Sequence, residues 1–283
     1  MRPPRPPRPL RRGADETFLY HTRHIHGSTE VAPGAAAPAA TAPPRPLTQR
    51  EIVMKLLDRY RTVLFDMHGV LMFGHDRFGP HEDFDRSYRA LGGRGLSESE
   101  VRRSILASFE GLRADARRPE RYDDFLSVPE ALKRYGDAPD DEIDRLTLVF
   151  ALHEVGLVPD ACAALLGRLA RTHRLGLVTN VWAPKHFWLR ELERVGVSDL
   201  FTSMVFSSDW RSIKPSSKLF STALSALDAA PDEVLFVGDS LQHDVEGAKR
   251  AGLRTVWVTS EQTRHGSADH VVASALELEH AAA

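Results

Sequence analysis

The chain has 283 residues, of which 42% are hydrophobic and 27% are charged. These proportions are ordinary for a globular protein and exclude a coiled-coil rod, a collagen-like chain and a wholly disordered chain. No segment approaches the roughly 20 consecutive apolar residues of a membrane helix, so we expect no membrane partner. The single cysteine, Cys162, cannot form an internal disulfide and favours a reducing, cytoplasmic location.

The N-terminal segment differs in composition from the rest of the chain. Residues 1–46 hold ten of the 18 prolines, and residues 1–50 hold eight arginines but only three acidic residues. Because such a segment buries little apolar surface, residues 1–47 are predicted to be a disordered Arg/Pro/Ala-rich tail. The tail is either dispensable or a ligand for a protein partner. The remainder of the chain is mildly acidic, which argues against a nucleic-acid partner.

Short apolar runs alternate with helical patterns after residue 47. Thr48 and Glu51 have the spacing of a capping box and predict a helix to about Arg59. Buried strands are then expected at 62–65, 175–178, 204–206, 234–237, 255–258 and 270–272, and helices at 160–171, 184–195, 216–228 and 241–251. Fully apolar strands that alternate with helices indicate an α/β fold, with a doubly wound, Rossmann-like parallel sheet.

More than a hundred residues separate the first two predicted strands, and these residues have helical patterns. Ser97 begins one helix, and Pro139 with the three acidic residues after it begins another that reaches about Glu154. We therefore predict an all-helical cap subdomain, residues 76–157, inserted into a core of residues 48–75 and 158–283. Glycines within residues 73–80 suit the hinge of a moving lid.

Polar residues follow several of the predicted strands. Ligands of open α/β sheets bind beyond the carboxyl ends of the strands, so these residues predict a site. Asp66 is a candidate nucleophile or metal ligand, and Asp239 could share a hard cation such as Mg²⁺ with it. Asp244, five residues later, could orient the waters of that metal.

Three further residues could bind an anion at the same edge of the sheet. Thr179 offers a hydroxyl, and Asn180 begins the segment after the strand and offers its amide. Lys214, which precedes a proline, offers a fixed positive charge.

Four of these segments together resemble the motifs of the haloacid dehalogenase-like (HAD) superfamily. They are Phe65–Leu71 (FDMHGVL), Val178–Asn180 (VTN), Lys214–Pro215 and Gly238–Asp244 (GDSLQHD), in the order found in that family. The resemblance extends over residues 60–275 and implies a family cap after the first motif. It does not identify a substrate.

The resemblance implies a mechanism for a small phosphorylated metabolite. Asp66 would attack phosphorus and form an aspartyl-phosphate, which water then hydrolyses. Mg²⁺ would be held by Asp66, by Asp239 and by the backbone carbonyl of His68. Thr179 and Lys214 would bind the phosphoryl oxygens, since positioning and charge stabilisation carry most of phosphoryl transfer.

One residue departs from the pattern of the family's phosphatases. His68 stands where they have a second aspartate, which protonates the leaving group and then activates water. Three interpretations follow: His68 itself is the acid–base catalyst; the acid–base catalyst is missing and the enzyme is slow or specialised for a good leaving group; or the chain cleaves phosphonates or halides. His68 also motivates an alternative function, a catalytically weak protein that binds phosphate ligands. The apparent Mg²⁺ site argues against the third interpretation, and Lys133 is the only cap lysine that could form a Schiff base.

The remaining candidates concern specificity. Arg77 and His81, at the start of the cap, could meet the leaving group. Trp182 and Lys185, just after the second motif, could form a wall of the pocket.

Overall fold

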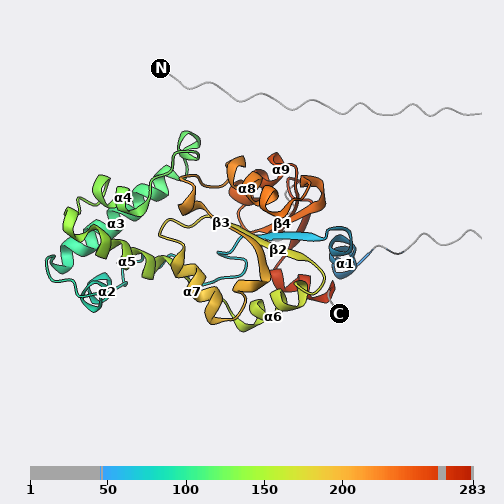
Figure 1. The fold of residues 1–283 in the computed structure, drawn as a ribbon, viewed down its shortest axis with the longest axis horizontal. Helices are drawn as coiled ribbons and strands as arrows, with labels where there is room; N and C mark the ends of the chain where they lie inside the picture. The colour runs from blue at the N-terminus through green and yellow to red at the C-terminus, as the bar shows by residue number, and fades with distance from the viewer. Residues whose placement is uncertain (1–44, 46, 261–265, 282–283) are drawn as a thin grey trace, which may run out of the picture. The chain divides into compact units, whose positions relative to one another are not determined.

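The structure is a computed structural model that describes residue 45 and residues 47–260 and 266–281 (Figure 1). Apart from Arg45 and Leu47, the predicted tail over residues 1–47 lies outside the described residues. Pro46–Ala283 form one compact unit, to which the following description applies.

A six-stranded sheet forms the centre of this unit. Its strands, in the order β3-β2-β1-β4-β5-β6, all pair in parallel. They are β1 (Thr62–Phe65), β2 (Arg174–Thr179), β3 (Phe201–Phe206), β4 (Val234–Gly238), β5 (Arg254–Val258) and β6 (His270–Val272). The predicted parallel α/β fold is therefore confirmed, with all six strands in place. Because β1 lies between β2 and β4, residues that follow these three strands are brought together.

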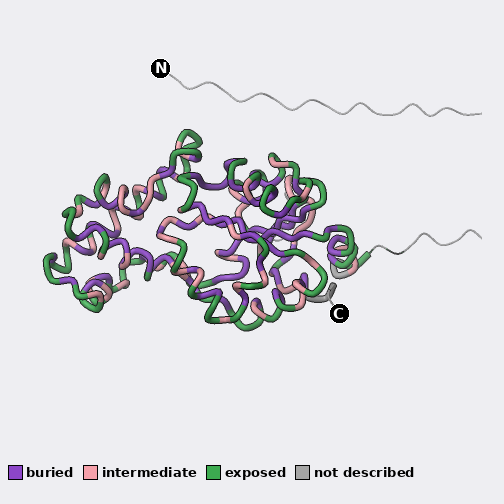
Figure 2. Tube along the Cα trace, viewed as in Figure 1, coloured by how far each residue is buried: buried purple, intermediate pink, exposed green. Residues whose placement is uncertain are grey.

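Helices cover both faces of the sheet, as expected for strands that are apolar on both sides. Val63 and Phe65 of β1 pack in the cluster that includes α1 (Gln49–Arg59), α6 (Asp160–Leu169) and α7 (His186–Arg194). Leu64, which points to the opposite face, packs in a second cluster with α8 (Ser217–Leu227) and α9 (Glu246–Arg250). The strands accordingly run through the buried interior (Figure 2).

Two elements differ from the sequence-based prediction. Strand β3 begins at Phe201 rather than at residue 204, because exposed Thr202 interrupts the apolar run from which the strand was predicted. The helix expected over 241–251 opens as a π-helical turn at Leu241–Val245 before α9. In that turn the Asp244 carboxylate accepts the backbone N–H groups of Asp239 and Ser240, which folds the turn back over the end of β4.

The long insertion between β1 and β2 is helical, as predicted. It contains α2 (Phe84–Ala90), α3 (Glu98–Asp115), α4 (Val128–Arg134) and α5 (Ile143–Glu154), with 3₁₀ turns at Pro119–Arg121 and Asp140–Glu142. These green helices form the left part of Figure 1. Their buried apolar side chains are continuous with those of the sheet. The exact limits of a cap at residues 76–157 stay a prediction.

The two ends of the insertion meet at its base. Phe73 and Leu157 form an antiparallel bridge, in which each backbone N–H donates to the other's carbonyl at 2.9 Å. The bonds continue outward, because Asp76 N–H donates to the Glu154 carbonyl at 3.1 Å. No helix in the described part of the chain has the length and apolarity needed to cross a bilayer.

Candidate active site

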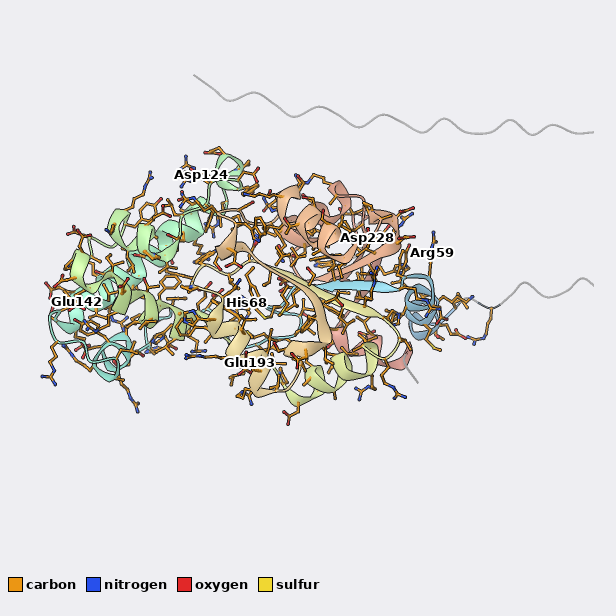
Figure 3. The ribbon with its side chains drawn as sticks, viewed as in Figure 1. Arg59, His68, Asp124, Glu142, Glu193 and Asp228 are labelled. Carbon is orange, nitrogen blue, oxygen red and sulfur yellow. The ribbon has the colours of Figure 1, made fainter. Side chains whose placement is uncertain are left out.

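The aspartates expected from the sequence converge beyond the ends of β1 and β4. Asp66 directly follows β1 and Asp239 follows β4, and these two strands are hydrogen-bonded neighbours. One carboxylate oxygen from each of Asp66, Asp239 and Asp244 lies within 4.8 Å of the other two. Figure 3 shows His68 in the same region, between the strand ends and the insertion.

Lys214 is the counter-charge of this cluster. Its Nζ lies 2.6 Å from Asp66 Oδ1 and 2.6 Å from Asp244 Oδ1, and its side chain is almost fully buried. Burial alone would lower the pKa of Lys214, but Asp244 and Asp66 outweigh burial and raise it. Lys214 is therefore a permanent cation beside the candidate nucleophile.

Asn180 holds the backbone of Lys214 in place. The Asn180 Oδ1 accepts the Lys214 N–H at 2.8 Å, and the Asn180 Nδ2 donates to the Lys214 carbonyl at 3.3 Å. The Asn180 side chain therefore binds the backbone of Lys214, and the expectation that Asn180 offers its amide to an anion stays a prediction. Thr179 is buried, and its hydroxyl oxygen has no hydrogen-bond partner within the described part of the chain. Thr179 is not among the residues that line the cavity described below, so its role in binding phosphate stays a prediction.

The donor set fits a hard divalent cation. Three carboxylates face one ammonium, and Mg²⁺ prefers carboxylate oxygens with waters and phosphate oxygens. Desolvation, followed by the charges of Asp66 and Asp244, raises the pKa of Asp239 to about 8. A bound cation would balance the three carboxylates, which Lys214 alone does not neutralise. Gly69, at φ 74°, leaves the space free, because a Cβ there would come within 2.0 Å of Asp239 Oδ2.

His68 has a fixed hydrogen-bonding state. The Trp188 indole N–H donates to His68 Nε2 at 2.9 Å, so Nε2 bears no proton and the neutral ring carries its proton on Nδ1. The His68 ring also stacks on His75, with 4.2 Å between centroids and 11° between planes. Burial, then His75 and Lys214, hold the pKa of His68 well below its usual range.

These contacts weigh on two interpretations of His68. A neutral Nδ1–H donates hydrogen bonds but is a very weak acid, and protonation of Nε2 would place a proton against the Trp188 N–H. The contacts therefore oppose His68 as the acid–base catalyst. His68, His75 and Asp76 also come close enough to suggest a second metal site. The same protonated Nδ1 opposes that ligand set, since a metal needs a free lone pair.

A cavity of about 190 Å³ connects these residues to the insertion. The predicted residues Asp66, His68, Asn180, Trp182, Lys214, Asp239 and Asp244 line it. His75, Asp76, Ala116, Glu154, Ser240 and His243 line it as well, although the sequence analysis did not name them as site residues. A hinge position was the only available signal for Asp76, and Glu154 looked like an ordinary helix-end residue.

Glu154 is the most unusual of these additional residues. Its carboxylate is buried and accepts the N–H of Trp182 at 2.6 Å and the N–H of Ala183 at 2.8 Å. Burial, and then the charge of Asp76, raise the pKa of Glu154 to about 8 even though these two hydrogen bonds favour ionisation. Glu154 thus connects the end of α5 to the segment after β2.

Three predicted specificity residues, and Lys133, lie outside the residues that line this cavity. The Arg77 guanidinium donates to the backbone carbonyls of Gly74, Val155 and Leu152, so it ties together the base of the insertion. His81 lines a separate hollow on the insertion with Glu82 and Arg102. Lys185 pairs with Asp209 at 2.7 Å, and Lys133 pairs with Asp140 at 2.6 Å. Ion pairing at exposed positions accounts for both lysines.

A tether joins the insertion to the loop that carries Lys214. Phe125 N–H donates to the Arg211 carbonyl, and Ile213 N–H donates to the Tyr122 carbonyl, both at 2.9 Å. The Asp123 carboxylate accepts the hydroxyls of Ser212, at 3.1 Å, and of Ser216, at 2.5 Å. These contacts lie on both sides of Lys214 along the chain.

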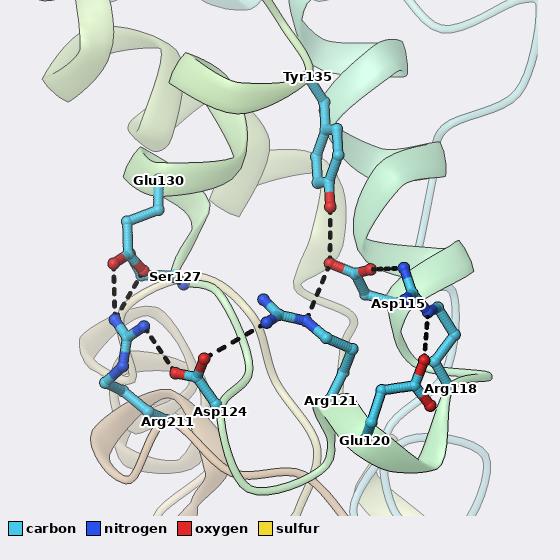
Figure 4. A network of polar contacts seen from close by, with 9 residues as sticks. All are labelled: Asp115, Arg118, Glu120, Arg121, Asp124, Ser127, Glu130, Tyr135 and Arg211. Carbon is cyan, nitrogen blue, oxygen red and sulfur yellow. Dashed lines mark hydrogen bonds and ion pairs between the residues drawn. The ribbon is translucent and has the colours of Figure 1, made fainter.

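Arg211 extends the tether into a wider polar network (Figure 4). Its Nη1 lies 2.7 Å and 2.8 Å from the two carboxylate oxygens of Glu130, and its Nη2 lies 3.1 Å from Asp124. Asp124 contacts Arg121, Arg121 contacts Asp115, and Asp115 accepts the Tyr135 hydroxyl at 2.7 Å. The loop that carries Lys214 is thus linked to α3, to the segment over residues 119–124 and to α4.

Comparisons with known proteins find haloacid dehalogenase-like hydrolases. The family model for haloacid dehalogenase-like hydrolases matches residues 130–258, a range that includes Lys214 and Asp239 but not Asp66. A HAD phosphatase of Thermococcus onnurineus is 27% identical, with a TM-score of 0.52, and the match covers 77% of this chain and 95% of that one. A 2-haloacid dehalogenase of Pseudomonas syringae, 21% identical with a TM-score of 0.54 over 78% of this chain and 97% of its own, shares the fold.

Curated relatives match over shorter segments. A phosphoserine phosphatase of Thermus thermophilus is 41% identical over 68 residues, which are 24% of this chain and 27% of the relative. A glyceraldehyde 3-phosphate phosphatase of Pyrococcus furiosus is 43% identical over 60 residues, or 21% and 25% of the two chains. The match therefore spans about a quarter of each of these relatives.

Proposed function

We propose that the chain is a haloacid dehalogenase-like hydrolase that cleaves a small phosphomonoester with the help of Mg²⁺. The observation that carries the proposal is the contact of Lys214 with both Asp66 and Asp244. Asp239 adds a third carboxyl group to this single cation, and its pKa is raised to about 8. A cytoplasmic location accords with the single, buried Cys162.

The reaction begins with Asp66. Lys214 orients the Asp66 carboxylate, and one carboxylate oxygen attacks phosphorus while the ester oxygen leaves. The products of this step are an aspartyl-phosphate and the alkoxide of the leaving group, which takes a proton from solvent water to become the alcohol. Lys214 and the unpartnered Thr179 hydroxyl bind phosphoryl oxygens, so the charge that develops there meets preorganised donors. Water then cleaves the aspartyl-phosphate and restores Asp66.

Asp66, Asp239 and the His68 carbonyl would hold Mg²⁺, which supplies charge neutralisation to the phosphoryl group when bound. Asp244 acts indirectly, since its two oxygens already bind Lys214 and the N–H groups of Asp239 and Ser240. Its role is to fix the position of the turn at Asp239 relative to Lys214.

The decisive experiment is a panel of phosphate esters with the purified chain, with and without Mg²⁺, over pH 5–9. We expect metal-dependent release of phosphate that Asp66→Asn abolishes and that Asp140→Asn, an exposed substitution on the insertion, leaves unchanged. Turnover that persists in Asp66→Asn would contradict the proposal. Turnover of haloacids or phosphonates but not of phosphate esters would contradict it as well.

The Trp188–His68 contact favours a second candidate, a phosphate-ligand-binding protein of low catalytic rate. His68→Asp separates the two candidates. General acid–base help is worth about 10²–10⁴-fold, so a large gain in kcat from negligible wild-type activity would favour the binding protein. A loss in kcat would show that the histidine serves turnover.

A further inference from the structure

The cavity receives several residues from the hinge and the insertion. His75 and Asp76 come from the hinge, and Ala116 and Glu154 from the insertion. The cluster of Asp66, Lys214 and Asp239 is proposed to receive the phosphoryl group. The alcohol part of the substrate therefore meets the hinge and insertion residues.

Acidic side chains outnumber lysine and arginine side chains among the described residues that line this cavity. Among the described residues that line it, Lys214 is the only lysine or arginine, and its Nζ is already 2.6 Å from each of two carboxylates. Arg77, at the nearby hinge, is occupied by three backbone carbonyls. A carboxylate or second phosphate on the alcohol would thus enter the cavity without a cationic partner, which is unfavourable in a partly desolvated site.

Two carboxyl groups stand where the alcohol would lie. Glu154 is buried and is oriented by the N–H groups of Trp182 and Ala183. Asp76 has a left-handed backbone, with φ 53°, and its N–H is fixed by the Glu154 carbonyl at 3.1 Å. A strained non-glycine residue beside a cavity is a recurrent feature of ligand sites. In the carboxylate form, both groups accept hydrogen bonds from hydroxyl or ammonium donors.

We propose that Asp76 and Glu154 recognise the alcohol part of the substrate, and that this part is a small polyol or amino alcohol without negative charge. The inference rests on the proposed function for the location of the phosphoryl group. The cavity volume of about 190 Å³ restricts the substrate to a small molecule.

Matched ligand pairs test the proposal by binding alone. Asp66→Asn, loaded with Mg²⁺ at pH 8, is titrated calorimetrically with glycerol 3-phosphate and 3-phosphoglycerate, which differ by a hydroxymethyl group against a carboxylate. A second pair, phosphoethanolamine and phosphoserine, differs by one carboxylate. We expect the member without the carboxylate to bind at least about tenfold more tightly in each pair.

Variants then assign the discrimination to residues. Asp76→Asn, which tolerates the same left-handed backbone, is expected to reduce the ratio within each pair to about threefold or less. Glu154→Gln is a second variant, and its fold is checked by circular dichroism because one backbone N–H loses its acceptor. Asp140→Asn, on the exposed side of the insertion, should retain the full ratio.

The outcomes separate this inference from the proposed function. Equal or tighter binding of the carboxylate-bearing members, no binding of either member, or an unchanged ratio in Asp76→Asn would each overturn the inference. Discrimination by Asp66→Asn together with a wild-type chain that shows no Asp66-dependent turnover would support the inference and overturn the proposed function. Asp66-dependent turnover in the wild type that favours the carboxylate-bearing members would support the proposed function and overturn the inference.

Discussion

The indole N–H of Trp188, in α7, donates to Nε2 of His68, two residues after the candidate nucleophile. The acceptor nitrogen is thereby kept free of a proton, and the His68 pKa is well below its usual range because of burial, His75 and Lys214. A histidine whose pKa is lowered by folding removes stability as the pH falls below its unfolded value of 6.5, since only the unfolded chain takes up the proton.

The first prediction concerns this tautomer. In ¹⁵N-edited NMR spectra, His68 is expected to stay neutral with its proton on Nδ1 from pH 8 down to about pH 6. In Trp188→Phe the Nε2 atom loses its donor, and the apparent pKa should rise. Ring signals of His68 that titrate near 6.5 in the wild-type chain would refute the assignment.

The second prediction concerns Lys214. Lys214→Met leaves Asp66 and Asp244 without their cation, so we expect the metal-free protein to lose about 3–5 kcal/mol of unfolding free energy. Mg²⁺ should restore part of this loss, whereas kcat should fall by at least about 10²-fold. Urea unfolding in EDTA and in Mg²⁺ measures the effect. Lys185→Met, which breaks an exposed pair, is the control, and an equal loss there would contradict the prediction.

The third prediction concerns the space beside Asp239. Gly69→Ala would place a Cβ within 2.0 Å of Asp239 Oδ2 at a φ of 74°, so the carboxylate must move. We expect the Mg²⁺ concentration for half-maximal activity to rise at least about tenfold. Gly79→Ala, where nothing lies within 4 Å of the added Cβ, should behave like the wild type. Unchanged metal dependence in Gly69→Ala would argue against Asp239 as a ligand.

The fourth prediction concerns the tether between the insertion and the Lys214 loop. Arg211→Ala removes the contacts with Glu130 and Asp124, and we expect kcat to fall about tenfold because small displacements of a charged catalytic group are costly. Arg113→Ala, which breaks an exposed pair within α3, should leave kcat unchanged. If only the melting temperature of Arg211→Ala changed, the tether would be structural and would not position Lys214.

The fifth prediction concerns acid. Although burial opposes it, hydrogen bonds from Ser127 and Arg211 lower the pKa of Glu130 to about 2. Since its ordinary value is 4.5, the stability that Glu130 contributes is present above pH 4.5 and is lost as the pH falls toward 2. The difference in unfolding free energy between the wild type and Glu130→Gln should therefore be smaller at pH 3.5 than at pH 6. A constant difference would show that the ion pair adds nothing.

The elements of the sheet were predictable because buried parallel strands are continuous apolar runs, as at Thr62–Phe65 and Val234–Val237. Asp66 and Asp239 were predictable for a related reason, since residues at neighbouring strand ends meet at one edge. The roles of Arg77 and Lys185 were not, because local sequence does not reveal whether a cation will find backbone carbonyls, a surface carboxylate or a ligand.

Glu154 and Trp188 show the same limit more clearly. Their partners, Trp182 and His68, are 28 and 120 residues away in the chain. Each contact exists only because separate helices pack against the strand ends, and no periodicity or capping pattern encodes such a pair. The departure at His68 was visible in the sequence, but the nitrogen that remains available depends on α7.

The bridge between Phe73 and Leu157 returns the chain to within one hydrogen-bonded pair of where it left. The two ends of the insertion are therefore as close together as the ends of a short loop, whatever the length of the segment between them. Helices could be lengthened, shortened or exchanged between those two positions while β1 and β2 kept their register. Such a junction would let evolution, or an engineer, replace the helices that contribute to the cavity, provided that the contacts with the Lys214 loop are kept.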